Sequence, residues 1–283
     1  MSPVLINPNL VSLRSDPFTT GIVYMPISLA YVAASLREEN LSPTVIDAFG
    51  NNPKKATVRD KFLVLGMDVG EILDSIPEHA SVVFLYANQV INHLAIIDLL
   101  ENLKKHRPDL PIVILENTQA VTSYNLLTVA DQFLEAGADY VAIGEPEMLS
   151  VELAKIFSEK IFDHKKIVAL GSIYCRDNRF PTRKLIEELD LLPFPAWDLF
   201  PLNNYWELGF AHGPQTRNRY LPMLTSRGCP YPCKFCVIPE SSKKKWRARS
   251  PDNVIQEMAF MKERFGVEEF HFEDLNSTVQ EKR

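Results

Sequence analysis

The sequence predicts an α/β protein whose first part is a parallel sheet with helices on both faces. The main observation is that short β-prone runs alternate with segments of helical spacing over residues 1–160. One run, residues 81–86 (SVVFLY), is apolar throughout, as in a strand buried on both faces. The charge is also uneven, because residues 216–283 carry thirteen Lys/Arg against nine Asp/Glu, whereas residues 1–215 carry 17 against 27. The chain therefore divides into two regions with different partners.

The elements of the first region follow one another in order. Residues 3–6 (PVLI) predict the first strand. A helix then begins near Pro26 and has one apolar face, formed by Leu29, Val32, Ala33 and Leu36. Residues 43–48 predict the second strand. Asp68 is a suitable N-cap for the next helix, whose apolar face is Val69, Ile72, Leu73 and Ile76.

The remaining elements of this region continue the alternation. Residues 81–86 predict the third strand, and the helix after it ends near Pro108 and has an apolar face of Ile96, Leu99, Leu100 and Leu103. Residues 111–115 and 138–144 predict the fourth and fifth strands, and a helix follows with Leu149, Leu153, Ile156 and Phe157 on one face. This order predicts a doubly wound, Rossmann-like sheet.

The loops after the strands are the candidate binding site, because open parallel sheets bind ligands at the carboxyl ends of their strands. These loops comprise residues 7–13, 87–90, 116–119 and 144–147. None contains the G-x-G-x-x-G turn of dinucleotide-binding proteins, so the sequence gives little support for a nicotinamide or flavin site. From the spacing of strands and helices alone, these loops would be interpreted as connections that bind no ligand.

The second region begins after a segment without regular period. Residues 161–215 include a stretch rich in proline and aromatic residues (189–206), which we expect to pack across a surface rather than to form a free linker. A strand over residues 221–226 and a cysteine-rich loop come next. The helix after the loop begins at Ser250 and Pro251, ends at Gly266 and is expected to face inward with Ile255, Met258, Ala259 and Met261. Residues 267–272 predict another strand, so this order opens a β/α barrel or a second parallel sheet.

Three of the four cysteines stand in the pattern C-x-x-x-C-x-x-C, at Cys229, Cys233 and Cys236. No apolar stretch is long enough for a membrane span and no secretory signal is evident, so we expect a cytoplasmic protein in which clustered cysteines bind metal. Structural zinc usually takes four protein ligands, so a zinc site that adds a distant residue such as His271 is the less favoured alternative. An iron–sulfur cluster held by three thiolates would leave one iron open to a further ligand.

The stretch TSRGCPYPCKFC resembles the signature of radical S-adenosylmethionine enzymes, including the aromatic residue before the third cysteine, Phe235. The resemblance implies a 4Fe–4S cluster on Cys229, Cys233 and Cys236, with S-adenosylmethionine on the open iron and a reductive cleavage that gives a 5′-deoxyadenosyl radical. It implies an electron donor such as flavodoxin or ferredoxin. It also implies that the end of the next strand helps to hold S-adenosylmethionine, through Glu273, Asp274 and Asn276.

The first region resembles the cobalamin-binding domain that precedes the barrel in one subgroup of that family. The similar segments are LINPN, residues 25–48, and YVAIGEPE. None of the six histidines stands in the D-x-H-x-x-G motif that ligates cobalt, so the resemblance implies cobalamin without a histidine ligand. A usual glycine pair is replaced by Glu116 and Asn117. The residues expected to bind cobalamin lie in the strand-end loops and are Asn7, Ala87, Asn88, Glu116, Asn117, Gly144 and Glu145.

The resemblance implies three parts: a cobalamin-binding domain (1–160), a connecting segment (161–215) and the start of a radical S-adenosylmethionine barrel (216–283) that ends at the beginning of a second helix. The implied reaction is methylation of an unactivated carbon in a small-molecule or lipid-like substrate. The alternatives are a cobalamin-dependent rearrangement or cyclisation, and a cobalamin-binding module without catalysis. The basic run 243–249 is not expected to bind nucleic acid; it predicts a solvated face, or arginines (Arg247, Arg249) that face the cluster.

Overall fold

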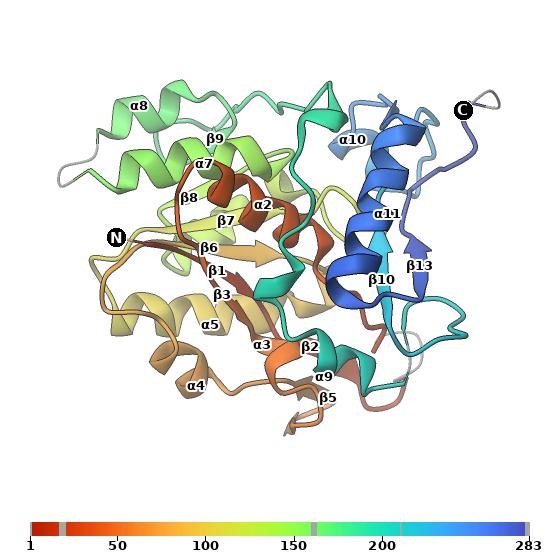
Figure 1. Cartoon of the computed structure of the whole chain (residues 1–283). Coiled ribbons are helices and arrows are strands. Elements are labelled where there is room, and N and C mark those ends of the chain that lie inside the picture. Colours follow the sequence, from red (N-terminus) through yellow and green to blue (C-terminus); the bar gives the residue numbers. More distant parts are fainter. Residues whose placement is uncertain (1, 17–20, 160–162, 210, 281–283) are drawn as a thin grey trace.

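The computed structural model describes residues 2–16, 21–159, 163–209 and 211–280. A six-stranded sheet lies at its centre, in the order β3-β1-β6-β7-β8-β9 (Figure 1). The neighbouring strands among the first five are parallel, and β9 is antiparallel to β8. The strands are β1 (Ser2–Asn7), β3 (Thr44–Asp47), β6 (Ala80–Ala87), β7 (Ile112–Glu116), β8 (Tyr140–Ala142) and β9 (Ile173–Tyr174). The predicted α/β class and mostly parallel sheet are thus confirmed.

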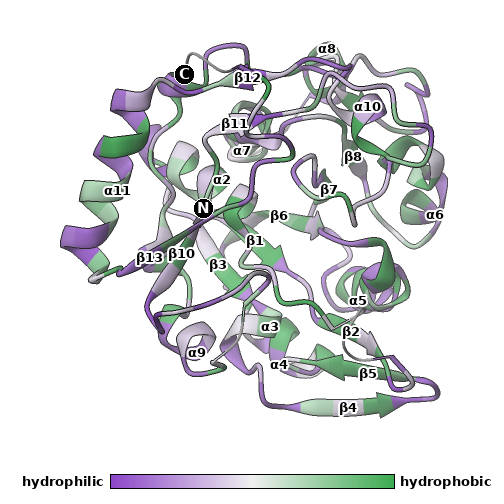
Figure 2. Cartoon of the chain, turned by 90° about the vertical axis from the view of Figure 1, so that its right-hand side faces the viewer, coloured by the Kyte–Doolittle hydropathy of each residue, from purple (hydrophilic) through white to green (hydrophobic). Residues whose placement is uncertain are grey.

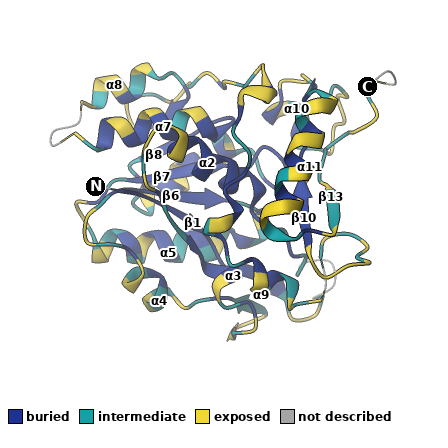
Figure 3. Ribbon diagram, viewed as in Figure 1, coloured by how far each residue is buried: buried dark blue, intermediate teal, exposed yellow. Residues whose placement is uncertain are grey.

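Helices cover both faces of this sheet. One face packs against α2 (Ile27–Glu38), α7 (Pro146–Phe157) and α8 (His164–Ala169), and the other against α4 (Val69–Asp74), α5 (His93–His106) and α6 (Ala130–Glu135). The two faces form two separate apolar clusters, because successive side chains of a strand point to opposite sides. Figure 3 shows the central strands as the most buried part of the chain. Asp68 caps α4 in a capping box with Glu71, as its position predicted.

Several short elements were not predicted. A three-stranded antiparallel sheet joins β2 (Leu10–Leu13), β5 (Phe62–Leu65) and β4 (Ala56–Arg59). Figure 2 shows it at one border of the molecule, apart from the central sheet. Its β4 is fully exposed and lacks an apolar face, so local pattern could not reveal it. The other short elements are α3 (Ala48–Asn51), β9, α6, α8, η1 (Val90–Asn92) and η2 (Leu126–Thr128).

The C-terminal region contains the predicted strand, loop, helix and strand. Strand β10 (Tyr220–Met223) pairs in parallel with β13 (Glu269–Phe272), and α11 (Pro251–Phe265) connects them. The expected strand 221–226 stops early, because β11 (Ser226–Arg227) turns away to pair antiparallel with β12 (Arg247–Ala248). The short helix α10 (Ile238–Ser241) follows the cysteine loop.

The inward face of α11 differs from the prediction. Met261 is buried as predicted, but Ile255 is 62% exposed and Ala259 is also exposed, while Val254 and Glu257 are buried instead. Glu257 was not among the expected inward residues, because its burial depends on the buried arginine that pairs with it, Arg249. Residues 273–280 are not helical, so the expected start of a second helix is wrong for them; residues 281–283 lie outside the described residues.

The proline- and aromatic-rich stretch 189–206 packs across the sheet domain and contains three short helical elements. These are η3 (Leu189–Leu191), η4 (Trp197–Leu199) and α9 (Leu202–Trp206). Trp197 and Tyr205 are fully buried, and the amide of Ala196 donates to the carbonyl oxygen of Ala30 at 3.0 Å. The stretch is therefore part of the core. Among the described residues, no helix has the length and apolar character needed to cross a bilayer.

Candidate functional site

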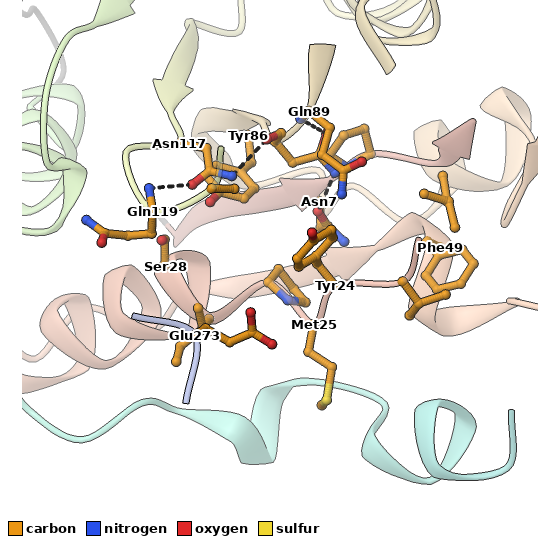
Figure 4. Close-up of a pocket in the computed structure, with 17 residues that line it drawn as sticks. Asn7, Tyr24, Met25, Ser28, Phe49, Tyr86, Gln89, Asn117, Gln119 and Glu273 are labelled. Atoms are coloured by element: carbon orange, nitrogen blue, oxygen red, sulfur yellow. Dashed lines mark hydrogen bonds between the residues drawn. The ribbon is translucent and has the colours of Figure 1, made fainter. Parts of the chain in front are cut away.

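A cleft lies where β1, β6 and β7 end, on the side that strand-end geometry predicted (Figure 4). Its empty volume, including space open to solvent, is about 620 Å³. Three asparagines that follow these strands line it: Asn7, Asn88 and Asn117. The segment before α2 contributes Tyr24 and Met25, and Glu273 reaches it from the end of β13. The cleft therefore joins the sheet domain to the C-terminal region.

The asparagines form a connected amide network. Asn88 Nδ2 donates to Asn7 Oδ1 at 3.3 Å, and Asn117 Nδ2 donates to the carbonyl oxygen of Asn88 at 2.8 Å. Asn7 Nδ2 donates to the buried carboxylate of Asp47 at 2.8 Å. Among the described residues, the buried Oε1 of Gln119, another residue of the cleft, has no hydrogen-bond partner. Because an unpaired buried acceptor is costly, it is a natural contact for a polar ligand.

Glu273 is held against the cleft by a histidine. His212 Nδ1 lies 2.9 Å from a carboxylate oxygen of Glu273, and the His212 ring packs against Tyr24 with centroids 4.3 Å apart and planes tilted by 32°. Burial raises the pKa of Tyr24, and the negative charge of Glu273 raises it further. The phenol of Tyr24 is therefore neutral at neutral pH, and it lies beside Glu273 in this part of the cleft.

The other two residues predicted to hold S-adenosylmethionine have partners within the protein. Asp274 accepts from the amide and hydroxyl of Thr225, at 3.0 and 3.1 Å, and from the Ser226 hydroxyl at 2.5 Å. The carbonyl oxygen of Asn276 accepts from Trp246 Nε1 at 2.8 Å. These contacts tie the end of β13 to the start of the cysteine loop.

The three cysteines lie in the loop between β11 and α10. All are free thiols; Cys233 is exposed, and Cys229 and Cys236 are partly exposed. Cys175 is buried outside this loop, next to β9. Across the described parts of the chain, no three His, Cys, Asp or Glu side chains are already gathered as a metal site. The donor set is nevertheless of the kind that holds an iron–sulfur cluster, because three cysteine thiols lie on one loop and none of them forms a disulfide. Phe235, beside them, is 93% exposed.

The remaining residues expected at the cobalamin site do not line the cleft. Ala87 is buried in β6. The carboxylate of Glu116 is buried, pairs with Arg183 and accepts the Gly144 amide. Burial raises the pKa of Glu116, while Arg183 opposes the shift. Glu145 is also buried and pairs with Arg247 at 2.7 Å. The structure therefore brings Asn7, Asn88 and Asn117 together on the cleft but not these four residues.

The basic run 243–249 is solvated only in part, because Lys243, Lys244 and Lys245 are exposed. Arg247 and Arg249 are buried, and their guanidinium groups pair with Glu145 and Glu257, at 2.7 and 2.6 Å. The expectation of a solvated face was wrong for these two arginines, because local sequence does not show the buried carboxylates that pair with them. Sequence reasoning also missed Tyr24, Met25 and His212, which no strand-end rule marks, whereas Gln119 lies in a loop that it did mark.

The fold and the site define an α/β protein with a strand-end cleft and, in its C-terminal region, a loop of three free cysteines. No protein-family model matches the chain. An uncharacterised methyltransferase of Pyrococcus horikoshii is 26% identical over 99% of this chain and 54% of its own length. The cytidylyl-2-hydroxyethylphosphonate methyltransferase of Streptomyces wedmorensis is 24% identical over 97% of this chain and 55% of its own.

A solved structure gives the same fold. The radical S-adenosylmethionine methyltransferase TsrM of Kitasatospora setae, with cobalamin and a [4Fe–4S] cluster bound, matches 96% of this chain and 49% of its own, with a TM-score of 0.61 and 18% identity. The chain is therefore homologous to methyltransferases over nearly its whole length, and it shares its fold with a radical S-adenosylmethionine methyltransferase. It spans about half the length of the curated relatives it matches.

Proposed function

We propose that the chain binds a 4Fe–4S cluster, S-adenosylmethionine and cobalamin as part of a radical S-adenosylmethionine methyltransferase. The observation that carries the proposal is the loop of three free thiols beside a parallel β10–β13 pair, in a chain homologous to such enzymes. Cys229, Cys233 and Cys236 would hold the cluster. We further propose the domain limits 1–160, 161–215 and 216–283, with β10, α11 and β13 as the first unit of a β/α barrel.

Each cofactor would have its own set of residues. S-adenosylmethionine would lie near Glu273, the partly buried residue that follows β13 and lines the cleft, and near Phe235, Asp274 and Asn276. Cobalamin would contact the cleft through the amides of Asn7, Asn88 and Asn117, while Ala87, Glu116, Gly144 and Glu145 would shape that edge from behind. Together the bound groups would supply an electron for cleaving S-adenosylmethionine and a carrier for the methyl group.

The residues of the chain would orient these groups and exclude water. The amide network presents both donors and acceptors to the cleft, which Glu273 also lines, and this mixture suits a partly polar ligand. The stretch 189–206 packs on the sheet domain and precedes the C-terminal region. It would therefore fix the position of the cysteine loop relative to the cleft. An electron donor such as flavodoxin or ferredoxin would reduce the cluster.

The reaction that we propose is methylation of an unactivated carbon in a small-molecule or lipid-like substrate. The competing reactions are a cobalamin-dependent rearrangement or cyclisation, and cobalamin binding without catalysis. The full-length protein with methyl-labelled S-adenosylmethionine and reductant separates them. Label in a carbon-bound methyl group supports methylation, and 5′-deoxyadenosine without transferred label supports rearrangement. Absence of 5′-deoxyadenosine supports the module without catalysis.

Cluster binding is tested first. Anaerobic reconstitution is expected to give about four irons per chain with a broad charge-transfer absorbance. Replacing Cys229, Cys233 and Cys236 together with alanine should abolish this iron, whereas Cys175→Ala, the matched control, should keep it. Retention of the same iron by the triple variant would show that the assignment is wrong. Titration with hydroxocobalamin should shift the cobalamin spectrum, and Asn117→Ala should weaken that binding.

A further inference from the structure

We propose that Glu145, the N-cap of α7, and Glu147, in the first turn of α7, are positioning residues that hold the cysteine loop in place through Arg227 and Arg247. This inference rests on the proposed function, because it assigns the partner of the cysteine loop within the same chain. It also gives the 144–147 loop a different role from the cofactor contact expected from sequence: the loop docks the C-terminal region onto the sheet domain.

The first contact is made by Arg227, two residues before Cys229. Its side chain is 3% exposed, and Nη2 donates to Glu147 Oε1 at 2.7 Å. Its other terminal nitrogen lies 3.8 Å from Glu145 Oε1. The guanidinium also lies over the ring of Tyr31 in α2, 5.2 Å from the ring centroid. Arg227 is therefore surrounded by the sheet domain on several sides.

The second contact is made by Arg247, the backbone partner of Arg227 in the β11–β12 pair. Both terminal nitrogens donate to Glu145, at 2.8 and 2.7 Å, and one also donates to the carbonyl oxygen of Ile186. A two-pronged guanidinium–carboxylate pair sets direction as well as distance. Because β11 and β12 are also paired through their backbones, the two arginines bind the hairpin to one loop as a unit.

The buried charges balance, so the arrangement depends on all four groups. Both glutamates and both arginines are at least nine-tenths buried. Removing one partner of such a pair leaves an uncompensated charge in a medium of low dielectric, which the structure relieves by letting water in or by moving the loop. Only Gly228 separates Arg227 from the first cysteine of the loop, Cys229. Loss of this docking should therefore reach the thiols.

The test compares two buried carboxylates that pair with arginines of the same region. Glu147→Gln removes the carboxylate charge that pairs with Arg227. Glu257→Gln, the matched control, removes a buried carboxylate charge of α11 that pairs with Arg249. In the iron-free full chain, we expect amide hydrogen exchange of residues 226–237 to be at least tenfold faster in Glu147→Gln than in the wild type. In Glu257→Gln these amides should keep their protection.

The second readout is spectroscopic. After reconstitution, the electron paramagnetic resonance spectrum of the reduced protein with S-adenosylmethionine should change in Glu147→Gln and not in Glu257→Gln. Unchanged exchange at residues 226–237 in Glu147→Gln, or equal effects in both variants, would overturn the proposal. If Glu147→Gln does not fold, the double variant Glu147→Gln/Arg227→Gln leaves no unpaired charge and is judged by the same exchange. If the wild-type protein takes up no iron, the proposed function is wrong but the docking proposal is still tested, because hydrogen exchange is measured in the iron-free protein.

Discussion

Replacing Gly228 with alanine would show how strongly the cysteine loop depends on its backbone. Gly228 has a φ of 82°, and an added Cβ would lie 2.1 Å from the carbonyl oxygen of Lys245. The left-handed conformation costs alanine about 1–2 kcal/mol. Alanine also reduces the conformational freedom of the unfolded chain, which offsets roughly 0.4–1 kcal/mol of that cost. The backbone clash adds about 1–3 kcal/mol. We therefore expect the free energy of unfolding to fall by about 3 kcal/mol.

Gly209→Ala is the matched control. Gly209 has a φ of 72°, but no atom lies within 4 Å of an added Cβ, so only the conformational cost applies, about 1 kcal/mol. Guanidinium unfolding of both variants, with the iron content after reconstitution, measures the difference. Equal free energies of unfolding and equal iron in the two variants would refute the reasoning, because the close approach to Lys245 would then have no energetic consequence.

Two further predictions concern single hydrogen-bonded carboxylates. Tyr205→Phe removes the hydroxyl that donates to the buried Asp47 at 2.7 Å, so urea unfolding should show a loss of about 1.5–3 kcal/mol; no loss would mean that α9 does not anchor the stretch 189–206. Glu269 accepts from the hydroxyl of Thr216 and pairs with His271, which lowers its pKa to about 2. Because the pKa of Glu269 is lowered in the fold, its ionised carboxylate stabilises the fold above the unfolded pKa of about 4.5, and this stabilisation is lost as the pH falls through 2. Glu269→Gln should therefore flatten the decline in stability between these two pH values. An unchanged acid limb would contradict this assignment.

Sequence reasoning identified the elements whose signal is local. The parallel strands, the helices α2, α4, α5 and α7, and the Asp68 cap were predicted because each depends on periodicity or on residues a few positions apart. The strand-end rule then located the cleft, since the carboxyl ends of parallel strands must share one edge. The cysteine triplet was equally visible, as its spacing lies within eight residues.

Features that depend on distant partners were decided only by the tertiary structure. The antiparallel β2–β5–β4 sheet joins β2 to a strand about fifty residues away. Arg247 and Arg249 looked as solvated as the exposed lysines before them, because a sequence shows charge but not the charge that faces it. Burial of Arg227 and Arg247 against Glu145 and Glu147 depends on contacts 80 and 102 residues apart. A local pattern reports what a segment can bury alone, whereas a buried ion pair exists only after folding brings both partners out of water.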